Sequence, residues 1–422
     1  MADNPAVKFA LMRGKTPEEA KLFWTGGPVE VAPRTWFASQ FSGCTAFETD
    51  EGLVLVDTGT RQFAPAIAAM LRQKTQAPVH TAIYTHGHVD HAYGLEAFLM
   101  PGQKHPRVIA HSAMPARFAR YAATARLNAA LNARQFGGTV EAASSDAYKA
   151  FGAPPVPPDT LYDERLTIAV GGVTFELKHC RGETDDHTWV WCPERGVLCP
   201  GDLFIWAVPN DGNPQKVQRY PWDRARGLRD MAACGPQAFC PGHGGPVVGD
   251  TALIVRMLTE TAEFLEAVVS RTLAAMENGA PPHVDIVTGI ELPKSDSPWL
   301  QPVYDDTEFL VRNVIRYYGG WWSGRPSELK PAPRAQLAAE IAQLGGGALS
   351  LAERAATLAD KGELRLACHL ADFALEAAPG DAAVQAKIAA VYEARAAKET
   401  SLMAVNIFNS AAAYAKSGRP FA

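Results

Sequence analysis

The sequence lacks any long apolar run. No stretch of 18 apolar residues occurs among its 422 residues, so the sequence predicts no membrane-spanning helix. Residues 1–5 also lack the basic start, and the following residues lack the apolar stretch, that are typical of a secretion signal. We therefore expect a cytoplasmic protein without a membrane span.

An excess of basic residues is also missing. The chain has 40 Lys and Arg residues against 45 Asp and Glu residues, a net charge of −5, which argues against a nucleic-acid partner. Its seven cysteines are odd in number and form no Cys-x-x-Cys pair, so we expect buried thiols in a reducing compartment. The length exceeds what one hydrophobic core usually covers, which predicts two domains.

The densest polar pattern of the chain follows an apolar segment at residues 79–84. His86, His88, Asp90 and His91 fall within six residues, between a predicted strand and a helix that we expect to begin near Asp90. The two loop histidines can face one metal ion, and the aspartate and histidine of the first helical turn can face a second. Imidazole nitrogens and carboxylate oxygens are the ligands that zinc prefers here.

Further polar residues follow predicted strands later in the chain, among them Glu183, Asp202 and His243. We expect them at the same edge of the fold as the histidine-rich loop. Two other residues have open roles. Asp57 either supports the ligands from behind or caps the helix expected at 64–74, and His187 is either a supporting residue or an ordinary buried histidine.

The run at residues 86–91, His-x-His-x-Asp-His, resembles the metal-binding motif of the metallo-β-lactamase superfamily. Where that superfamily usually has Gly-His-Thr-x-x-His, residues 182–187 place Glu183 in the position of the histidine, which resembles the alkylsulfatase branch. Asp202 stands where characterised alkylsulfatases usually have Glu. The resemblance implies an α/β fold, an αββα sandwich, that holds one or two metal ions.

The resemblance also implies a ligand set and a cofactor. We expect two Zn²⁺ per chain, with Asp90 and Asp202 as the catalytic carboxylates. His86, His88 and Glu183 would hold one ion, Asp90, His91 and His243 would hold the other, and Asp202 would lie between them.

A second domain of different character is expected after the catalytic one. A Gly/Pro-rich stretch at 278–282 follows a long amphipathic helix predicted at 252–276, so we predict a catalytic domain at 1–280 and a helical domain at 281–422. Residues 312–326 resemble the opening of the alkylsulfatase dimerisation domain. The helix pair at 364–391 resembles one tetratricopeptide unit, which cannot bury its own face, so we expect a homodimer. Many alkylsulfatases add a third, lipid-carrier-like domain, which we expect this chain to lack.

The implied activity is hydrolysis of an alkyl sulfate by a metal-activated water molecule. The substrate would be an anionic ester with an apolar tail. Substrate contacts are predicted from a polar helix at 113–135 and from the aromatic residues of the segment 312–326. For the helix the alternative is a solvated face, and for the aromatic residues it is a hydrophobic core. The predicted contacts are Asn128, Arg134, Tyr318, Trp322 and Arg325. The tail would also pass Trp206, Tyr317 and Trp321. The leaving group could be held by Arg117, Arg134, Arg219 or Arg325.

Other readings of the same site remain open. The segment 202–210 lacks the histidine with which alkylsulfatases handle sulfate, so the main alternative is hydrolysis of a carboxylic ester, lactone or β-lactam. A di-iron oxidoreductase would normally need a flavin domain, for which no segment is apparent. The complete ligand set disfavours a metal-free scaffold.

Overall fold

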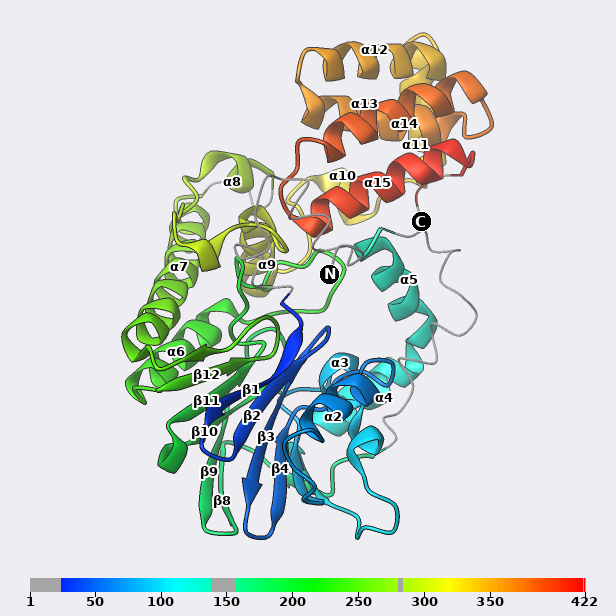
Figure 1. Cartoon of the computed structure of the whole chain (residues 1–422). Helices are drawn as coiled ribbons and strands as arrows, with labels where there is room; N and C mark the ends of the chain where they lie inside the picture. Colours follow the sequence, from blue (N-terminus) through cyan, green and yellow to red (C-terminus); the bar gives the residue numbers. More distant parts are fainter. Residues whose placement is uncertain (1–23, 138–155, 280–283, 420, 422) are drawn as a thin grey trace. The chain divides into compact units, whose positions relative to one another are not determined.

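The computed structural model describes residues 24–137, 156–279, 284–419 and 421 (Figure 1). These residues form two compact units. The first contains residues 24–125, 156–279 and 286–318, and the second contains residues 126–137, 284–285, 319–419 and 421. The predicted boundary at residue 280 lies outside the described residues and stays a prediction.

The first unit contains two β-sheets. One sheet has seven strands in sequence order, antiparallel from β1 to β4 and parallel from β4 to β7. The other has six strands in the order β13-β12-β11-β10-β9-β8. The strands of the first sheet are β1 (Gly26–Ala32), β2 (Thr35–Ser39), β3 (Gly43–Thr49), β4 (Gly52–Val56), β5 (Val79–Ile83), β6 (Arg107–His111) and β7 (Thr160–Tyr162). Those of the second are β8 (Arg165–Val170), β9 (Val173–His179), β10 (Thr188–Cys192), β11 (Val197–Gly201), β12 (Ala238–Pro241) and β13 (Val247–Val248).

The two sheets face one another across a shared apolar core, in which Phe47 of one sheet meets Phe175 of the other edge to face at 5.1 Å. Helices cover the outer faces (Figure 1). They are α2 (Ala64–Leu71), α3 (Val89–Ala92) and α4 (Met114–Ala123) on one side and α6 (Pro221–Ala233) and α7 (Thr251–Glu277) on the other. Because both faces of each sheet are covered, β4 is buried along its whole length. The predicted αββα sandwich is confirmed.

The helix expected to begin near Asp90 is shorter than predicted. It ends at Ala92, and a separate 3₁₀ turn spans Leu95–Phe98. Between them Gly94 packs so closely on the backbone of Thr58 that a side chain there would collide with its carbonyl oxygen. The predicted polar helix at 113–135 is likewise two helices, α4 and α5 (Ala125–Gln135).

The second unit is all-helical, as predicted. Its alanine-rich helices pack around a core that includes Leu358, Ala371 and Ile388. The Asp381 side chain accepts hydrogen bonds from the backbone N–H groups of Ala383 and Val384, which fixes the start of α14. The helices are α10 (Pro326–Leu329), α11 (Arg334–Leu344), α12 (Ala348–Asp360), α13 (Leu364–Ala377), α14 (Ala382–Ala396) and α15 (Leu402–Lys416).

Two further helices lie between α7 and α10 in the described residues. The first unit ends in α9 (Thr307–Gly319), and α8 (Val284–Gly289) precedes it. Within the described residues, none of the helices combines the length and the apolar character needed to cross a membrane.

Candidate metal centre

Two histidines of the loop after β5 bring their ring nitrogens together. The Nε2 atom of His86 lies 2.7 Å from the Nδ1 atom of His88. Burial lowers the pKa of both imidazoles well below the ordinary value, and the neighbouring His91 and Arg117 add to the effect on His86 and His88 respectively. Neutral imidazoles carry the free lone pair that a metal ion requires. We call His86, His88 and the nearby Glu183 the His86 cluster.

A second group of donors lies on the other side of Asp202, and we call Asp90, His91 and His243 the Asp90 cluster. The Nε2 atom of His91 is 3.4 Å from an oxygen of Asp90, and the Nε2 atom of His243 is 3.3 Å from the same oxygen. Burial alone would lower the pKa of both histidines, but the carboxylates of Asp202 and Asp90 raise it well above the ordinary value. The carboxylates of this centre therefore favour positive charge on or beside these imidazoles.

Asp202 lies between the two clusters. Its carboxylate is 3.8 Å from His86 Nε2, 3.4 Å from His91 Nε2 and 3.2 Å from His243 Nε2. Ligand atoms within 4.8 Å of one another form two possible metal groups, one with His86, His88 and Asp202 and one with Asp90, His91 and His243.

Two atoms of this centre support metal binding directly. Within the described residues, His91 Nε2 and Asp202 Oδ1 are buried without a hydrogen-bond partner. Such atoms are costly unless something satisfies them. An imidazole nitrogen and a carboxylate oxygen that face one another in this way fit a shared metal ion.

Asp57 orients His91 from behind. Its carboxylate is 2.8 Å from His91 Nδ1 and accepts a hydrogen bond of 2.7 Å from the backbone N–H of Thr85. The contact fixes the ring so that its Nε2 atom faces the centre, as supporting carboxylates do at metal sites. The alternative role as a helix cap is not the one found, because α2 begins after Phe63 without a side-chain cap.

His187 contacts the centre through Asp202. Its Nε2 atom accepts a hydrogen bond of 3.0 Å from the backbone N–H of Asp202, and its ring stacks on His86 at 4.5 Å. Because Nε2 accepts this bond, the proton of the neutral ring is on Nδ1. His187 therefore uses its lone pair to hold the loop that carries Asp202.

Glu183 is held by partners that the sequence did not reveal. Its Oε1 atom is 2.8 Å from Arg219 Nη1 and accepts a 2.7 Å hydrogen bond from Asn210 Nδ2, while His88 Nδ1 lies 3.6 Å away. Its Oε2 atom is buried and has no partner among the described residues. The structure thus leaves one oxygen of Glu183 for a further ligand.

The arginines considered as anion-holding groups are already paired in the first unit. Arg219 pairs with Glu183, and Arg117 pairs with Asp185 and Asp186. Both arginines are buried. Neither guanidinium is therefore free of carboxylate, and their role in holding the leaving group stays a prediction.

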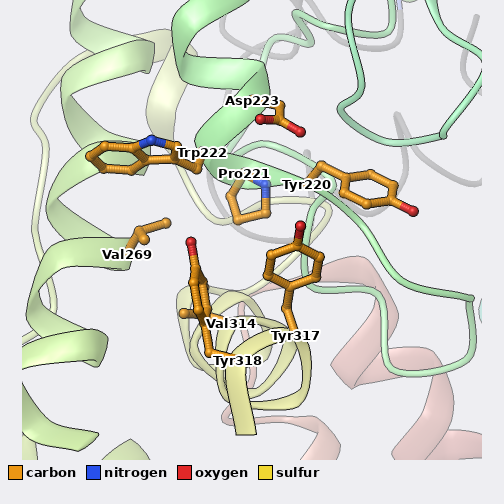
Figure 2. A pocket seen from close by; sticks show the side chains of 8 residues that line it. All are labelled: Tyr220, Pro221, Trp222, Asp223, Val269, Val314, Tyr317 and Tyr318. Carbon is orange, nitrogen blue, oxygen red and sulfur yellow. The ribbon is translucent and has the colours of Figure 1, made fainter. Parts of the chain in front are cut away.

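The predicted substrate contacts fall in different places. Tyr318 lines a surface pocket together with Tyr317, Tyr220 and Trp222 (Figure 2). The prediction for Trp206 is wrong, because its ring is buried in the core and its Nε1–H donates to the Gly245 carbonyl. The remaining predicted contacts belong to the second unit and stay predictions; they are Asn128, Arg134, Trp321, Trp322 and Arg325.

Comparison with known families divides the chain into two matches. The family described as "Metallo-beta-lactamase superfamily" matches residues 41–243, and the family described as "Alkyl sulfatase dimerisation" matches residues 283–418. The first match lies within the predicted catalytic domain, and the second lies within the predicted helical domain.

Characterised relatives and solved structures agree with these matches. The chain is 25% identical to a linear primary-alkylsulfatase of Pseudomonas sp. (strain ATCC 19151), over 85% of this chain and 70% of the relative. It is 23% identical to an (R)-specific secondary-alkylsulfatase of Pseudomonas sp., over 86% of this chain but only 58% of that relative. The stereoselective inverting sec-alkylsulfatase Pisa1 from Pseudomonas sp. superimposes with a TM-score of 0.84 at 20% identity, over 98% of this chain and 71% of that structure, which establishes the fold.

Proposed function

Because this chain belongs to the metallo-β-lactamase superfamily, in its alkylsulfatase-like branch, we propose that it hydrolyses an alkyl sulfate ester with two zinc ions. The observation that carries the proposal is the position of Asp202, whose carboxylate lies within 3.8 Å of histidines from both clusters. A carboxylate in this position can be shared by the two ions of a two-metal hydrolytic centre.

The proposed ligands are the seven residues that the sequence suggested. His86, His88 and Glu183 would hold one ion, Asp90, His91 and His243 would hold the other, and Asp202 would contact both. When bound, the ions would lower the pKa of a water molecule to about 7 and so supply a nucleophile at neutral pH.

The chain's own carboxylates have a second task in this proposal. Burial opposes ionisation of Asp90 and Asp202, but the neighbouring histidines hold the pKa of both carboxyls well below the usual range. Both are therefore ionised at neutral pH and can accept a hydrogen bond from the attacking water molecule, which orients it.

The apolar tail of the substrate is proposed to lie on aromatic side chains. The pocket of Figure 2 offers Tyr220, Trp222, Tyr317 and Tyr318 around Val269 and Val314. Each methylene that an apolar wall removes from water contributes up to about 0.8 kcal/mol. The value of kcat/KM should then rise with chain length over medium-chain alkyl sulfates, and Tyr318→Ala should flatten that rise.

The second unit supports a homodimer in this proposal, since it matches a dimerisation family. An obligate interface commonly buries about 2,000 Å² or more. Light scattering at micromolar concentration should therefore give the mass of two chains. A monomer under these conditions would count against the assembly but not against the hydrolytic centre.

The deciding experiment is a hydrolysis screen of the zinc-loaded protein. Alkyl sulfates, carboxylic esters, lactones and β-lactams would be compared in water enriched in heavy oxygen. An alkyl sulfate that is attacked at carbon gives labelled alcohol, whereas attack at sulfur or at a carbonyl puts the label in the acid product.

The second candidate, a carboxylic ester or lactone hydrolase, also has an observation in its favour. Residues 202–210 contain no histidine, and Arg117 and Arg219 are already engaged with carboxylates. Clear ester or lactone hydrolysis without sulfate release from any alkyl sulfate would favour this candidate.

A further inference from the structure

The pair of Glu183 and Arg219 is buried at the edge of the metal centre. The side chains are only 4% and 3% exposed, and Arg219 Nη1 lies 2.8 Å from Glu183 Oε1. Arg219 also donates to the backbone carbonyl of Asn210, whose side-chain amide donates to the same Oε1 atom. One oxygen of Glu183 is therefore fully engaged by a cation and an amide.

The engagement limits how Glu183 can bind a metal ion. Oε1 already accepts two hydrogen bonds, whereas Oε2 is buried without a partner among the described residues. Only Oε2 is left as a ligand atom, so Glu183 would bind through one oxygen. Arg219 also cancels the charge of Glu183 at close range in a buried setting, where electrostatic effects are strong.

We infer that Arg219 acts as a positioning residue that makes Glu183 equivalent to a neutral, single-atom ligand and thereby weakens zinc binding at the His86 cluster. The inference rests on the proposed two-zinc centre. A neutral ligand with one donor atom is also what a histidine would provide at this position, so the pair of Glu183 and Arg219 replaces an imidazole. A weaker hold on zinc leaves that ion a stronger Lewis acid.

The charge of the whole centre supports the same conclusion. Two divalent ions and three carboxylates leave a small net positive charge, and Arg219 adds one further unit. The centre then attracts an anionic ester more strongly than its carboxylates alone suggest. In this way Arg219 assists an anionic substrate without contacting it.

The inference predicts that Arg219→Met raises zinc affinity, whereas substitutions behind a metal ligand usually lower it. Without the guanidinium, the full charge of Glu183 becomes available to zinc, and Oε1 keeps only the hydrogen bond from Asn210. The affinity of the weaker zinc position should rise by about tenfold, the size of effect that groups behind metal ligands usually have. The metal-free protein should unfold at a lower temperature, because Glu183 is left buried without its partner, and zinc should restore that temperature.

The experiment is a zinc titration against a coloured chelator, together with thermal unfolding with and without zinc. Arg117→Met is the matched control, since it also removes a buried arginine paired with carboxylates, Asp185 and Asp186. Arg117→Met leaves the contacts of Glu183 unchanged, so it should lower the unfolding temperature and raise zinc affinity clearly less than Arg219→Met does. Combining Arg219→Met with Glu183→Gln should abolish the gain, because no carboxylate remains to be released.

The outcomes separate the inference from the proposed function. If the unaltered protein binds fewer than two zinc ions, the proposed centre is wrong. If it binds two ions but Arg219→Met leaves the weaker affinity unchanged or lowers it, the inference is overturned and Arg219 only holds the loop around Asn210.

Discussion

The two donor clusters of the metal centre differ in how their carboxylates are held. In the Asp90 cluster, the Asp90 carboxylate faces two imidazoles, at 3.3 Å from His243 and 3.4 Å from His91. In the His86 cluster, the Glu183 carboxylate faces Arg219 at 2.8 Å and lies farther, at 3.6 Å, from His88. In one cluster the carboxylate faces histidines that are themselves proposed metal ligands, and in the other it faces an arginine that is not.

This difference suggests that the two positions have different tasks. Negative charge that only a metal ion can neutralise favours tight binding, so the Asp90 cluster is expected to keep its ion more firmly. A carboxylate that an arginine has already neutralised contributes less to affinity. The four predictions that follow either remove this asymmetry or sharpen it.

The largest effect is expected from Asp202→Ala, which removes the one side chain that both clusters share. Both ions should be lost or strongly weakened, and kcat/KM should fall by more than about a hundredfold, since this exceeds what supporting residues usually cost. Metal analysis after gel filtration and steady-state kinetics would measure the two effects. One tightly bound ion with near-normal turnover would show that the clusters do not depend on a shared carboxylate.

Asp57→Asn should affect mainly the Asp90 cluster. Asparagine keeps the size of the side chain but cannot provide the charge that faces His91 Nδ1 at 2.8 Å. We expect zinc affinity and turnover to fall by about 10-fold to 100-fold, as is usual for carboxylates behind a histidine ligand. Metal content should fall toward one ion per chain, and an unchanged content of two would remove Asp57 from this role.

Glu183→Gln should affect mainly the His86 cluster. The substitution leaves Arg219 buried without its carboxylate, next to the metal position. Zinc retention should weaken and turnover should fall by at least about tenfold. If the variant keeps both ions and the full rate, the third ligand of this cluster is another residue, and His187 is then the first candidate.

The parts of the site that lie close together in sequence could be predicted from the sequence. His86, His88, Asp90 and His91 follow a single strand, so local order alone brings them together. The strand ends that carry Asp202 and His243 belong to neighbouring parallel strands, β11 and β12, and end at the same edge. Alternation and strand length placed them after strands, and the resemblance to the metallo-β-lactamase superfamily identified them as ligands.

The parts that depend on distant contacts could not be predicted. The pairing of Arg219 with Glu183 joins separate loops, and no periodicity or motif signals it. The prediction that Trp206 lies along the substrate tail is wrong, because an aromatic side chain has the same sequence pattern in a core and in a groove, and the structure buries it. The early end of α3 depends on the close approach of Gly94 to Thr58, which sequence spacing does not express.

The smallest effect is expected from His187→Gln. This variant tests whether His187, rather than Glu183, is the third ligand of the His86 cluster. His187 contacts the backbone N–H of Asp202 through Nε2 and stacks on His86, so it touches the centre without directing a lone pair into it. Glutamine keeps an acceptor of similar reach, and we expect two zinc ions per chain with a decrease in turnover of no more than about tenfold. Metal content is the discriminating measurement, because His187 and Glu183 are alternative third ligands. If His187→Gln empties one metal position while Glu183→Gln retains both ions, the imidazole is the ligand, and Glu183 serves only to pair with Arg219.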